Sequence, residues 1–153
     1  MAYISLVRST LEYSAPIWDP YLKVDITKIE KIQRKAARFI QNDYKYTSSV
    51  TLMLKQLGWK DLETRRRDLR LALFFKVVKG LVAVKAEDIG LEPADQRTRS
   101  QHEFKYRIPK CNTNNMLYFL PARTIPIWNN LLADVVNSEK VDIFKEKLLK
   151  HFK

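Results

Sequence analysis

Positively charged side chains recur at helical spacing in two stretches of the chain, and their chemistry suits phosphate. Ammonium and guanidinium groups along a helix face neutralise successive phosphates and release the counterions condensed around them. Guanidinium groups also fork onto phosphate oxygens, which favours arginine for close contacts. The sequence therefore predicts a binding site for the backbone of RNA or DNA. Its residues are Lys28, Lys31, Lys35, Arg38, Arg65, Arg66, Arg67 and Arg70.

The overall charge favours the same kind of partner. The 153 residues include 28 lysines and arginines against 17 aspartates and glutamates, a formal net charge of +11. Fifteen basic and six acidic residues lie between Lys23 and Lys79, so most of the excess is concentrated there. Phosphate contacts hold a strand without reading its bases. A charged helix face is also often only solvated surface, so the alternative is a structural or protein-protein interaction module without nucleic-acid binding.

Residue patterns typical of catalysis are sparse. The chain has three glycines, and it contains no glycine-rich phosphate loop, Gly-x-Ser-x-Gly elbow or His-Glu-x-x-His helix. A two-metal site needs clustered carboxylates, and the only acidic cluster, Glu87–Asp95, contains Gly90 and Pro93 and is typical of a surface loop. His102 lies in a polar stretch and is expected to be exposed. We expect no catalytic residue, metal site or cofactor in this chain, and therefore no enzyme activity.

Cysteine usage and hydropathy bear on the compartment. The single cysteine, Cys111, rules out an internal disulfide framework, and no apolar run approaches the length of a membrane span. The first residues lack the basic flank and apolar segment of a secretion signal. These features favour an intracellular protein, nuclear or cytoplasmic, without a membrane partner.

The elements that must position the basic residues are mostly helices. Apolar residues recur at helical spacing, and three glycines are few for an all-β chain. Asp25 suits the N-cap or first turn of a helix that runs to about Gln41. The expected apolar face of that helix is Ile29, Ile32, Ala36 and Ile40.

Two further helices follow in the first half of the chain. Ser48 or Ser49 is expected to cap a shorter helix through Leu57, with Gly58 at its C-terminal end. Asp61 then opens the longest helical pattern, over residues 62–79.

The C-terminal half mixes an alternating segment with helices. Residues 104–108 alternate aromatic or apolar with basic side chains, and residues 116–120 form an apolar run beyond an Asn-rich turn, which predicts a small β-hairpin. We expect a short helix over residues 125–132 and a terminal helix capped by Ser138. The expected fold class is mainly α, a multi-helix bundle with this hairpin.

The expected organisation has three parts. Residues 1–82 form a basic helical region, residues 83–98 an acidic loop, and residues 99–153 the hairpin with the C-terminal helices. The last part is expected to pack with the first as one domain.

Several aromatic-bearing motifs occur in an order that resembles a known family. The chain is similar to the region after the polymerase palm in reverse transcriptases of non-LTR retrotransposons of the jockey-like type, and the likeness covers nearly its whole length. The segments that carry it are Leu6–Arg8, Leu11–Tyr21, Ile29–Phe39, Leu57–Trp59, Leu62–Glu63, Arg65–Arg67, Arg97–Arg99 and Arg123–Asn129.

The resemblance implies a C-terminal thumb and tail segment of an RNA-directed DNA polymerase, which would grip template and primer backbones. The family's Tyr/Phe-x-Asp-Asp motif has no counterpart here, and neither do its fingers, palm or endonuclease, so no catalytic residue carries over. The implied partner is a primer-template of RNA or DNA. Self-association or the missing polymerase domains are the further partners expected for a mobile-element fragment with an uncovered apolar surface.

Overall fold

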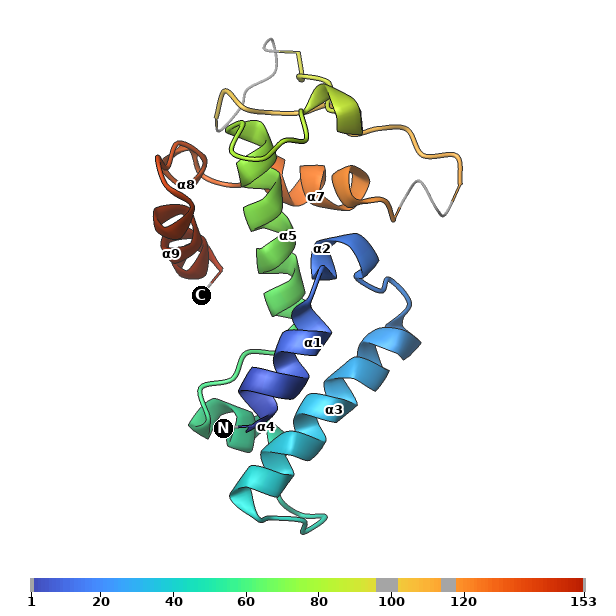
Figure 1. The fold of residues 1–153 in the computed structure, drawn as a ribbon, viewed down its shortest axis with the longest axis vertical. Helices are drawn as coiled ribbons and strands as arrows, with labels where there is room; N and C mark the ends of the chain where they lie inside the picture. Colours follow the sequence, from blue (N-terminus) through green and yellow to red (C-terminus); the bar gives the residue numbers. More distant parts are fainter. Residues whose placement is uncertain (1, 96–101, 114–117, 153) are drawn as a thin grey trace. The chain divides into compact units, whose positions relative to one another are not determined.

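The computed structural model describes residues 2–95, 102–113 and 118–152, and its mainly helical architecture confirms the expected class (Figure 1). The chain divides into two compact units, residues 1–67 and 68–153. The division lies inside α5 (Leu62–Val78), whereas the sequence placed the end of the first region at residue 82. Each unit has a hydrophobic cluster of its own.

The first unit is built from short and long helical segments before α5. A π-helical segment, η1, continues directly into α1, and the two lie alongside α3 (Figure 1). The core of this unit joins Tyr3, Ala37, Met53 and Trp59, with the Tyr3 ring stacked on the Trp59 indole at 4.7 Å between centroids. The elements are η1 (Tyr3–Arg8), α1 (Ser9–Glu12), α2 (Ala15–Trp18), α3 (Lys23–Gln41) and α4 (Val50–Gln56).

Helix α3 has the extent that the sequence predicts, but it shows a different face to the core. Asp25 lies in its first turn, where the helix dipole favours a carboxylate, and the helix ends at Gln41. Its buried residues are Gln33 and Ala37, whereas Ile32 is 41% exposed. The expected face through Ile29, Ile32, Ala36 and Ile40 is therefore only partly inward.

Hydrogen bonds to the side-chain amide of Gln33 explain why this side of α3, and not the expected apolar face, points toward the core. The hydroxyl of Tyr3 donates to Gln33 Oε1 at 3.2 Å, and Gln33 Nε2 donates to the carbonyl of Lys60 at 2.8 Å. A buried amide is stable only when its polar atoms are paired, so these partners hold the Gln33 side of α3 toward the core.

The connection from α4 to α5 follows the sequence closely. Gly58 adopts φ +65, and the N–H of Trp59 donates to the carbonyl of Leu54 at 2.8 Å, an arrangement that ends helices with a left-handed glycine. Asp61 Oδ2 then accepts the N–H of Thr64 at 2.7 Å and begins α5. Both expected helix boundaries are confirmed.

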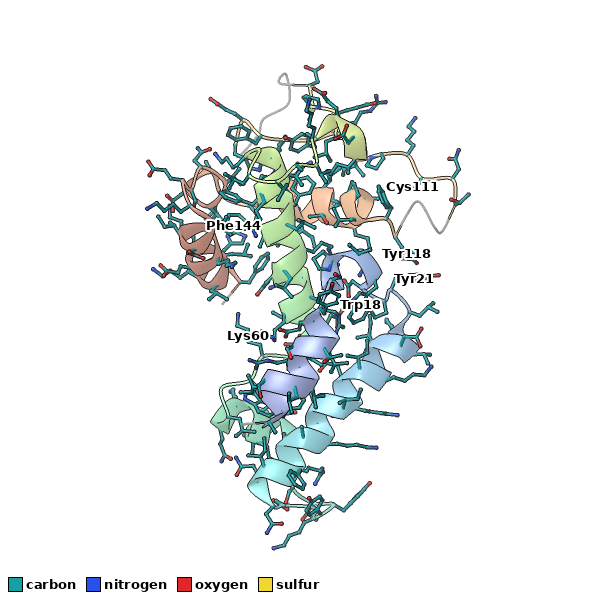
Figure 2. All side chains as sticks on the ribbon, viewed as in Figure 1. Trp18, Tyr21, Lys60, Cys111, Tyr118 and Phe144 are labelled. Atoms are coloured by element: carbon teal, nitrogen blue, oxygen red, sulfur yellow. The ribbon has the colours of Figure 1, made fainter. Side chains whose placement is uncertain are left out.

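The second unit has the larger core. Beyond the C-terminal part of α5, it contains η2 (Glu87–Ile89), α7 (Leu120–Asn129), α8 (Ala133–Val136) and α9 (Val141–His151). Phe144 of α9, labelled in Figure 2, stacks on Phe75 of α5 at 4.4 Å between ring centroids. The ring centroids of Trp128 of α7 and Phe74 of α5 are 5.0 Å apart. Large aromatic rings thus supply much of the burial that stabilises this unit.

The predicted β-hairpin is wrong. Tyr106 pairs with Pro93 in an isolated antiparallel bridge, with the N–H of Arg107 donating to the carbonyl of Glu92 at 2.8 Å. Leu120, expected in the second strand, begins α7, because Pro121 suits the first turn of a helix. Residues 116 and 117 lie outside the described part of the chain.

Asn129 also holds the alternating segment. Its side-chain Oδ1 accepts the N–H of Tyr106 at 3.1 Å and its Nδ2 donates to the carbonyl of Tyr106 at 2.7 Å. The Asn129 side-chain amide therefore makes the hydrogen bonds to the Tyr106 backbone that a neighbouring strand would make.

Two smaller expectations in the second unit are also corrected. Ser138 does not cap α9, whose N-cap is Lys140; its hydroxyl instead donates to the carbonyl of Val135 at 2.8 Å. His102 is buried rather than exposed, and its Nε2–H donates to the carbonyl of Trp128 at 3.1 Å. Burial lowers the pKa of His102.

Candidate nucleic-acid interface

Three of the predicted basic residues form one exposed stripe on α3. Lys28, Lys31 and Lys35 are all exposed, and at about 100° per residue they fall within about 60° of one another around the helix. The buried residues Gln33 and Ala37 lie on the opposite side of the helix. We call these three residues the lysine stripe.

The lysine stripe is lightly paired. Lys28 Nζ lies 2.9 Å from Asp25 Oδ1 one turn earlier, and both side chains are well exposed, so water competes for this ion pair. Within the part of the chain that the structure describes, no ion pair is formed by Lys31 or Lys35. The ammonium groups of the stripe are therefore accessible to an anionic ligand.

Arg38, predicted as part of the same set, is occupied by a loop. Its guanidinium donates to the carbonyl of Lys45 at 2.9 Å, and to those of Asp43 and Ser48 at 3.4 Å each. These bonds close the connection between α3 and α4. A phosphate at this position would have to compete with backbone acceptors for the guanidinium.

The first two arginines of α5 are paired with carboxylates of the same unit. Arg65 donates two hydrogen bonds to the carboxylate of Glu12, from Nε to Oε1 and from Nη2 to Oε2, the second at 2.8 Å. Arg66 Nε lies 2.8 Å from Asp19 Oδ1, and their side chains are only 1% and 7% exposed. Their positive charges are balanced inside the protein.

The remaining two arginines are also partly or wholly inside. Arg67 is half-buried and Arg70 is 5% exposed. The structure thus brings Lys28, Lys31 and Lys35 together on one exposed face of α3, whereas the four arginines of α5 are half-buried or buried.

Sequence reasoning missed the carboxylates that accept these arginines. Glu12 and Asp19 lie far from α5 in the chain, in α1 and just after α2, and no local spacing joins them to it. The available signal was that Glu12 and Asp19 are the two acidic residues among the first 22, a segment rich in apolar and aromatic residues. Buried carboxylates are rare without a partner, so each called for a cation.

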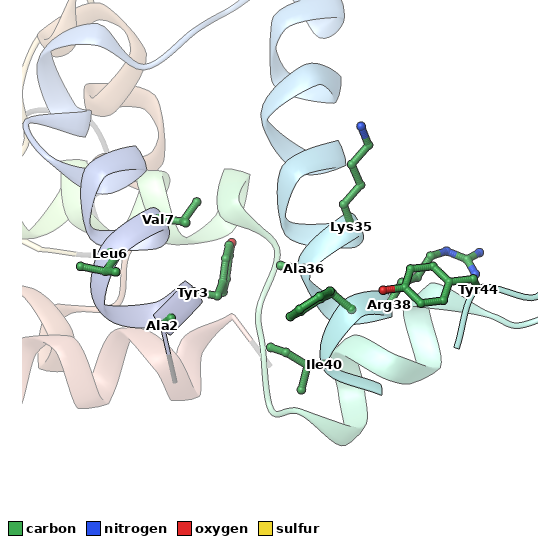
Figure 3. A pocket seen from close by; sticks show the side chains of 10 residues that line it. Ala2, Tyr3, Leu6, Val7, Lys35, Ala36, Arg38, Ile40 and Tyr44 are labelled. Carbon is green, nitrogen blue, oxygen red and sulfur yellow. The ribbon is translucent and has the colours of Figure 1, made fainter. Parts of the chain in front are cut away.

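An apolar groove adjoins the lysine stripe, between η1 and the C-terminal part of α3 (Figure 3). It has a volume of about 720 Å³, and Figure 3 shows Tyr3 and Val7 facing Ala36 across it. Exposed apolar side chains form much of its wall, including Leu6 at 67% and Phe39 at 75% exposed. The η1/α3 groove is lined by Ala2, Tyr3, Leu6, Val7, Lys35, Ala36, Arg38, Phe39, Ile40 and Tyr44.

Polar groups near the side of α3 away from the stripe have shifted pKa values. Burial raises the pKa of Tyr3 to about 12. Burial also raises the pKa of Glu30, although its Oε1 accepts the N–H of Glu63 at 2.8 Å. For Asp61, burial is outweighed by hydrogen bonds from the hydroxyl and N–H of Thr64, which lower the pKa. Two helices are therefore joined by polar contacts on the side of α3 away from the lysines.

Among the described residues, no cluster of metal-ligating side chains is found. Across residues 2–95, 102–113 and 118–152, no three His, Cys, Asp or Glu side chains gather where they could hold a metal ion. In the same ranges, every helix is too short or too polar to cross a lipid bilayer. The expected absence of a cofactor stays a prediction.

Comparison of the chain with family models, with curated proteins and with solved structures gives no match. The likeness to retrotransposon reverse transcriptases therefore rests on the sequence motifs alone.

Proposed function

We propose that this chain is a non-catalytic C-terminal fragment of a retrotransposon RNA-directed DNA polymerase that binds template and primer nucleic acid through phosphate contacts. The family assignment is supported by the ordered sequence motifs, and the binding mode by the lysine stripe. The observation that carries the binding mode is the exposure of Lys28, Lys31 and Lys35 on the side of α3 opposite its buried residues.

The dimensions of the stripe suit a nucleic-acid backbone. Lys28 and Lys35 are two helical turns apart, which places their positions about 10 Å apart along the axis. This length corresponds to about three steps of about 3.4 Å along one strand of B-DNA. Lysine ammonium groups bind phosphate as point charges without demanding one geometry, so such contacts fit RNA and DNA alike.

In this proposal, arginines at the start of α5 stabilise the fold and do not contact phosphate. Because Arg65 and Arg66 are held by Glu12 and Asp19, we assign them to the folding of the first unit rather than to phosphate contact. Arg38 likewise stabilises the loop that follows the stripe.

The test is the salt dependence of binding to a fluorescent primer-template duplex, measured by anisotropy. Each phosphate contact contributes about 0.9 to the slope of log affinity against log salt concentration. Changing Lys28, Lys31 and Lys35 together to alanine should therefore reduce the slope by about two to three units.

A variant with the same loss of charge elsewhere controls for non-specific attraction. Lys140, Lys145 and Lys150 are exposed on the second unit, and their triple alanine variant should keep nearly the full slope. Equal slopes for the two triple variants would remove α3 from the contact surface.

The second candidate function is an interaction module that binds protein and no nucleic acid. It is favoured by the η1/α3 groove, whose apolar walls are exposed to solvent. A chain that binds no primer-template even at low salt would leave this function as the better one.

A further inference from the structure

We propose that the η1/α3 groove is a docking site for an acidic amphipathic helix of a partner protein. The proposal goes beyond nucleic-acid binding and does not depend on it, because it rests on the apolar walls of the groove. Phosphate contact would use the ammonium groups of the lysine stripe, of which Lys35 also lines the groove.

The shape of the groove matches a helix. Leu6 and Val7 line one wall from η1, and Ala36, Phe39 and Ile40 line the other from α3, each wall spanning little more than one helical turn. Between these two walls, η1 and α3 leave an open groove in which a third helix could lie. A partner helix would insert apolar anchors at positions i and i+3 or i+4, the usual pattern of helix-in-groove recognition.

The exposure of the walls shows that nothing within the described chain covers them. Leu6 is 67% and Phe39 75% exposed, whereas Tyr3, which also lines the groove, is buried. Large apolar side chains clustered in a groove mark an interaction surface, because leaving them in water is unfavourable.

The charges at the rim select an acidic partner. Among the described residues, Lys35 and Arg38 are the charged residues that line the groove, and no acidic one does. Because the Arg38 guanidinium donates to loop carbonyls, Lys35 is the cation at the rim that a partner carboxylate would meet. Figure 3 shows the Lys35 side chain pointing away from the apolar floor, where it can meet a carboxylate on the flank of a docked helix. Lys31, one turn earlier on α3, extends the same positive edge.

The same charges disfavour a second copy of this chain as the occupant. A symmetric contact would bring each groove, with its Lys35 and Arg38, against the same surface of another molecule of net charge +11. Like charges juxtaposed at an interface are unfavourable, whereas glutamates on a partner helix would be attracted.

The proposal is tested with two synthetic helical peptides of about 18 residues, long enough to populate a helix. Both carry leucines at i, i+4 and i+7 and an identical fluorescent label, and their flanking residues are either all glutamate or all lysine. Titration of the full chain at moderate salt, followed by anisotropy, should show saturable binding of the glutamate peptide. The lysine peptide should bind at least about tenfold more weakly.

Variants locate the binding on the groove. Because Leu6 and Phe39 are largely exposed, the double variant Leu6→Ala/Phe39→Ala should keep the helical circular dichroism of the parent and weaken glutamate-peptide binding by about tenfold or more. Leu52→Ala removes a side chain of similar exposure, 61%, from α4 outside the groove, and it should bind the peptide like the parent.

Each contrary outcome has a distinct meaning. Unchanged affinity of the folded double variant overturns the groove as the site, and equal binding of the two peptides overturns the acidic partner. A micromolar dimer that the double variant converts to monomer assigns the groove to a second copy and overturns the proposal. If the chain binds the glutamate peptide and does not bind primer-template, the docking proposal stands and the proposed nucleic-acid binding function is rejected.

Discussion

The lysines of α3 and the arginines of α5 have similar sequence signatures and different surroundings. Both sets are basic residues on helices of the same stretch, and the sequence assigns both to phosphate contact. In the structure the lysines face solvent, while Arg65 and Arg66 meet Glu12 and Asp19. Net positive charge in a stretch of sequence is therefore a poor measure of the charge that a ligand can reach.

The difference follows from the chemistry of the two side chains. Guanidinium is planar, less strongly hydrated than ammonium and able to make forked bonds with a carboxylate, so it is the cation that proteins bury. Ammonium is strongly hydrated and stays in water at the end of a flexible stem. The contrast between Arg66, 1% exposed, and Lys28, 68% exposed, is the expected consequence.

The largest change in stability should come from removing the Asp19 carboxylate that pairs with Arg66. Asp19→Ala leaves a buried guanidinium without its counterion, which typically reduces the free energy of unfolding by about 3–5 kcal/mol. Urea unfolding followed by circular dichroism would measure the loss. A change below about 1 kcal/mol would show that α5 does not depend on this ion pair.

A compensating variant sharpens this result. Among the described residues, Nη1 and Nη2 of Arg66 have no hydrogen-bond partner, so the ion pair is held through Nε alone. Replacing the cation as well, in Asp19→Ala/Arg66→Met, should recover much of the lost stability because an apolar side chain needs no counterion.

The second effect concerns the buried hydroxyl that orients α3. Tyr3 is protonated in both states below pH 10.0, its ordinary pKa, so stability there is intact. Between pH 10.0 and about 12, tyrosine ionises in the unfolded chain and not in the folded one, so the free energy of unfolding falls as pH rises. The full loss, reached above pH 12, should approach about 3 kcal/mol, because each pKa unit corresponds to about 1.4 kcal/mol.

Tyr3→Phe provides the comparison for this alkaline transition. It keeps the ring that stacks on Trp59 and removes the ionisable group, so its unfolding free energy should depend less on pH between 9 and 12. The measurement is urea unfolding of both chains at several pH values. Parallel profiles would show that ionisation of another group causes the alkaline loss.

A third effect tests ligand contact directly and compares the two sets of cations. Lys35→Ala should lower the salt slope of primer-template binding by about 0.9, the contribution of one phosphate. Glu12→Gln/Arg65→Gln removes one charge of each sign, keeps the net charge and allows an amide pair to replace the ion pair. Its slope should stay unchanged. A reduction of about 0.9 in this double variant would place Arg65 on the phosphate surface.

Much of the helical framework was predictable because its signals are local. The ends of α3, the glycine that terminates α4 and the aspartate that opens α5 all lie within a few residues of the bonds that define them. The lysine stripe was predictable for the same reason, since helical spacing alone places its members on one face.

The parts that failed depend on partners distant in sequence. The inward face of α3 is set by Tyr3 and Lys60 acting on Gln33, and no periodicity count includes a buried glutamine. The expected hairpin failed because Asn129 and Glu92 pair with the alternating segment, and Leu120 of the expected second strand begins α7. The groove also went unforeseen, because Phe39 and Leu6 become neighbours only when η1 packs on α3.

The smallest effect should come from the exposed ion pair of the lysine stripe. Lys28→Gln breaks the contact with Asp25, yet both side chains are well hydrated, so the free energy of unfolding should change by no more than about 0.5 kcal/mol. The same variant should still lower the salt slope of primer-template binding by about 0.9, because a phosphate would lose its cation. A stability loss above about 1 kcal/mol would make Lys28 a structural residue like Arg66, and the distinction between the two sets of cations would fail.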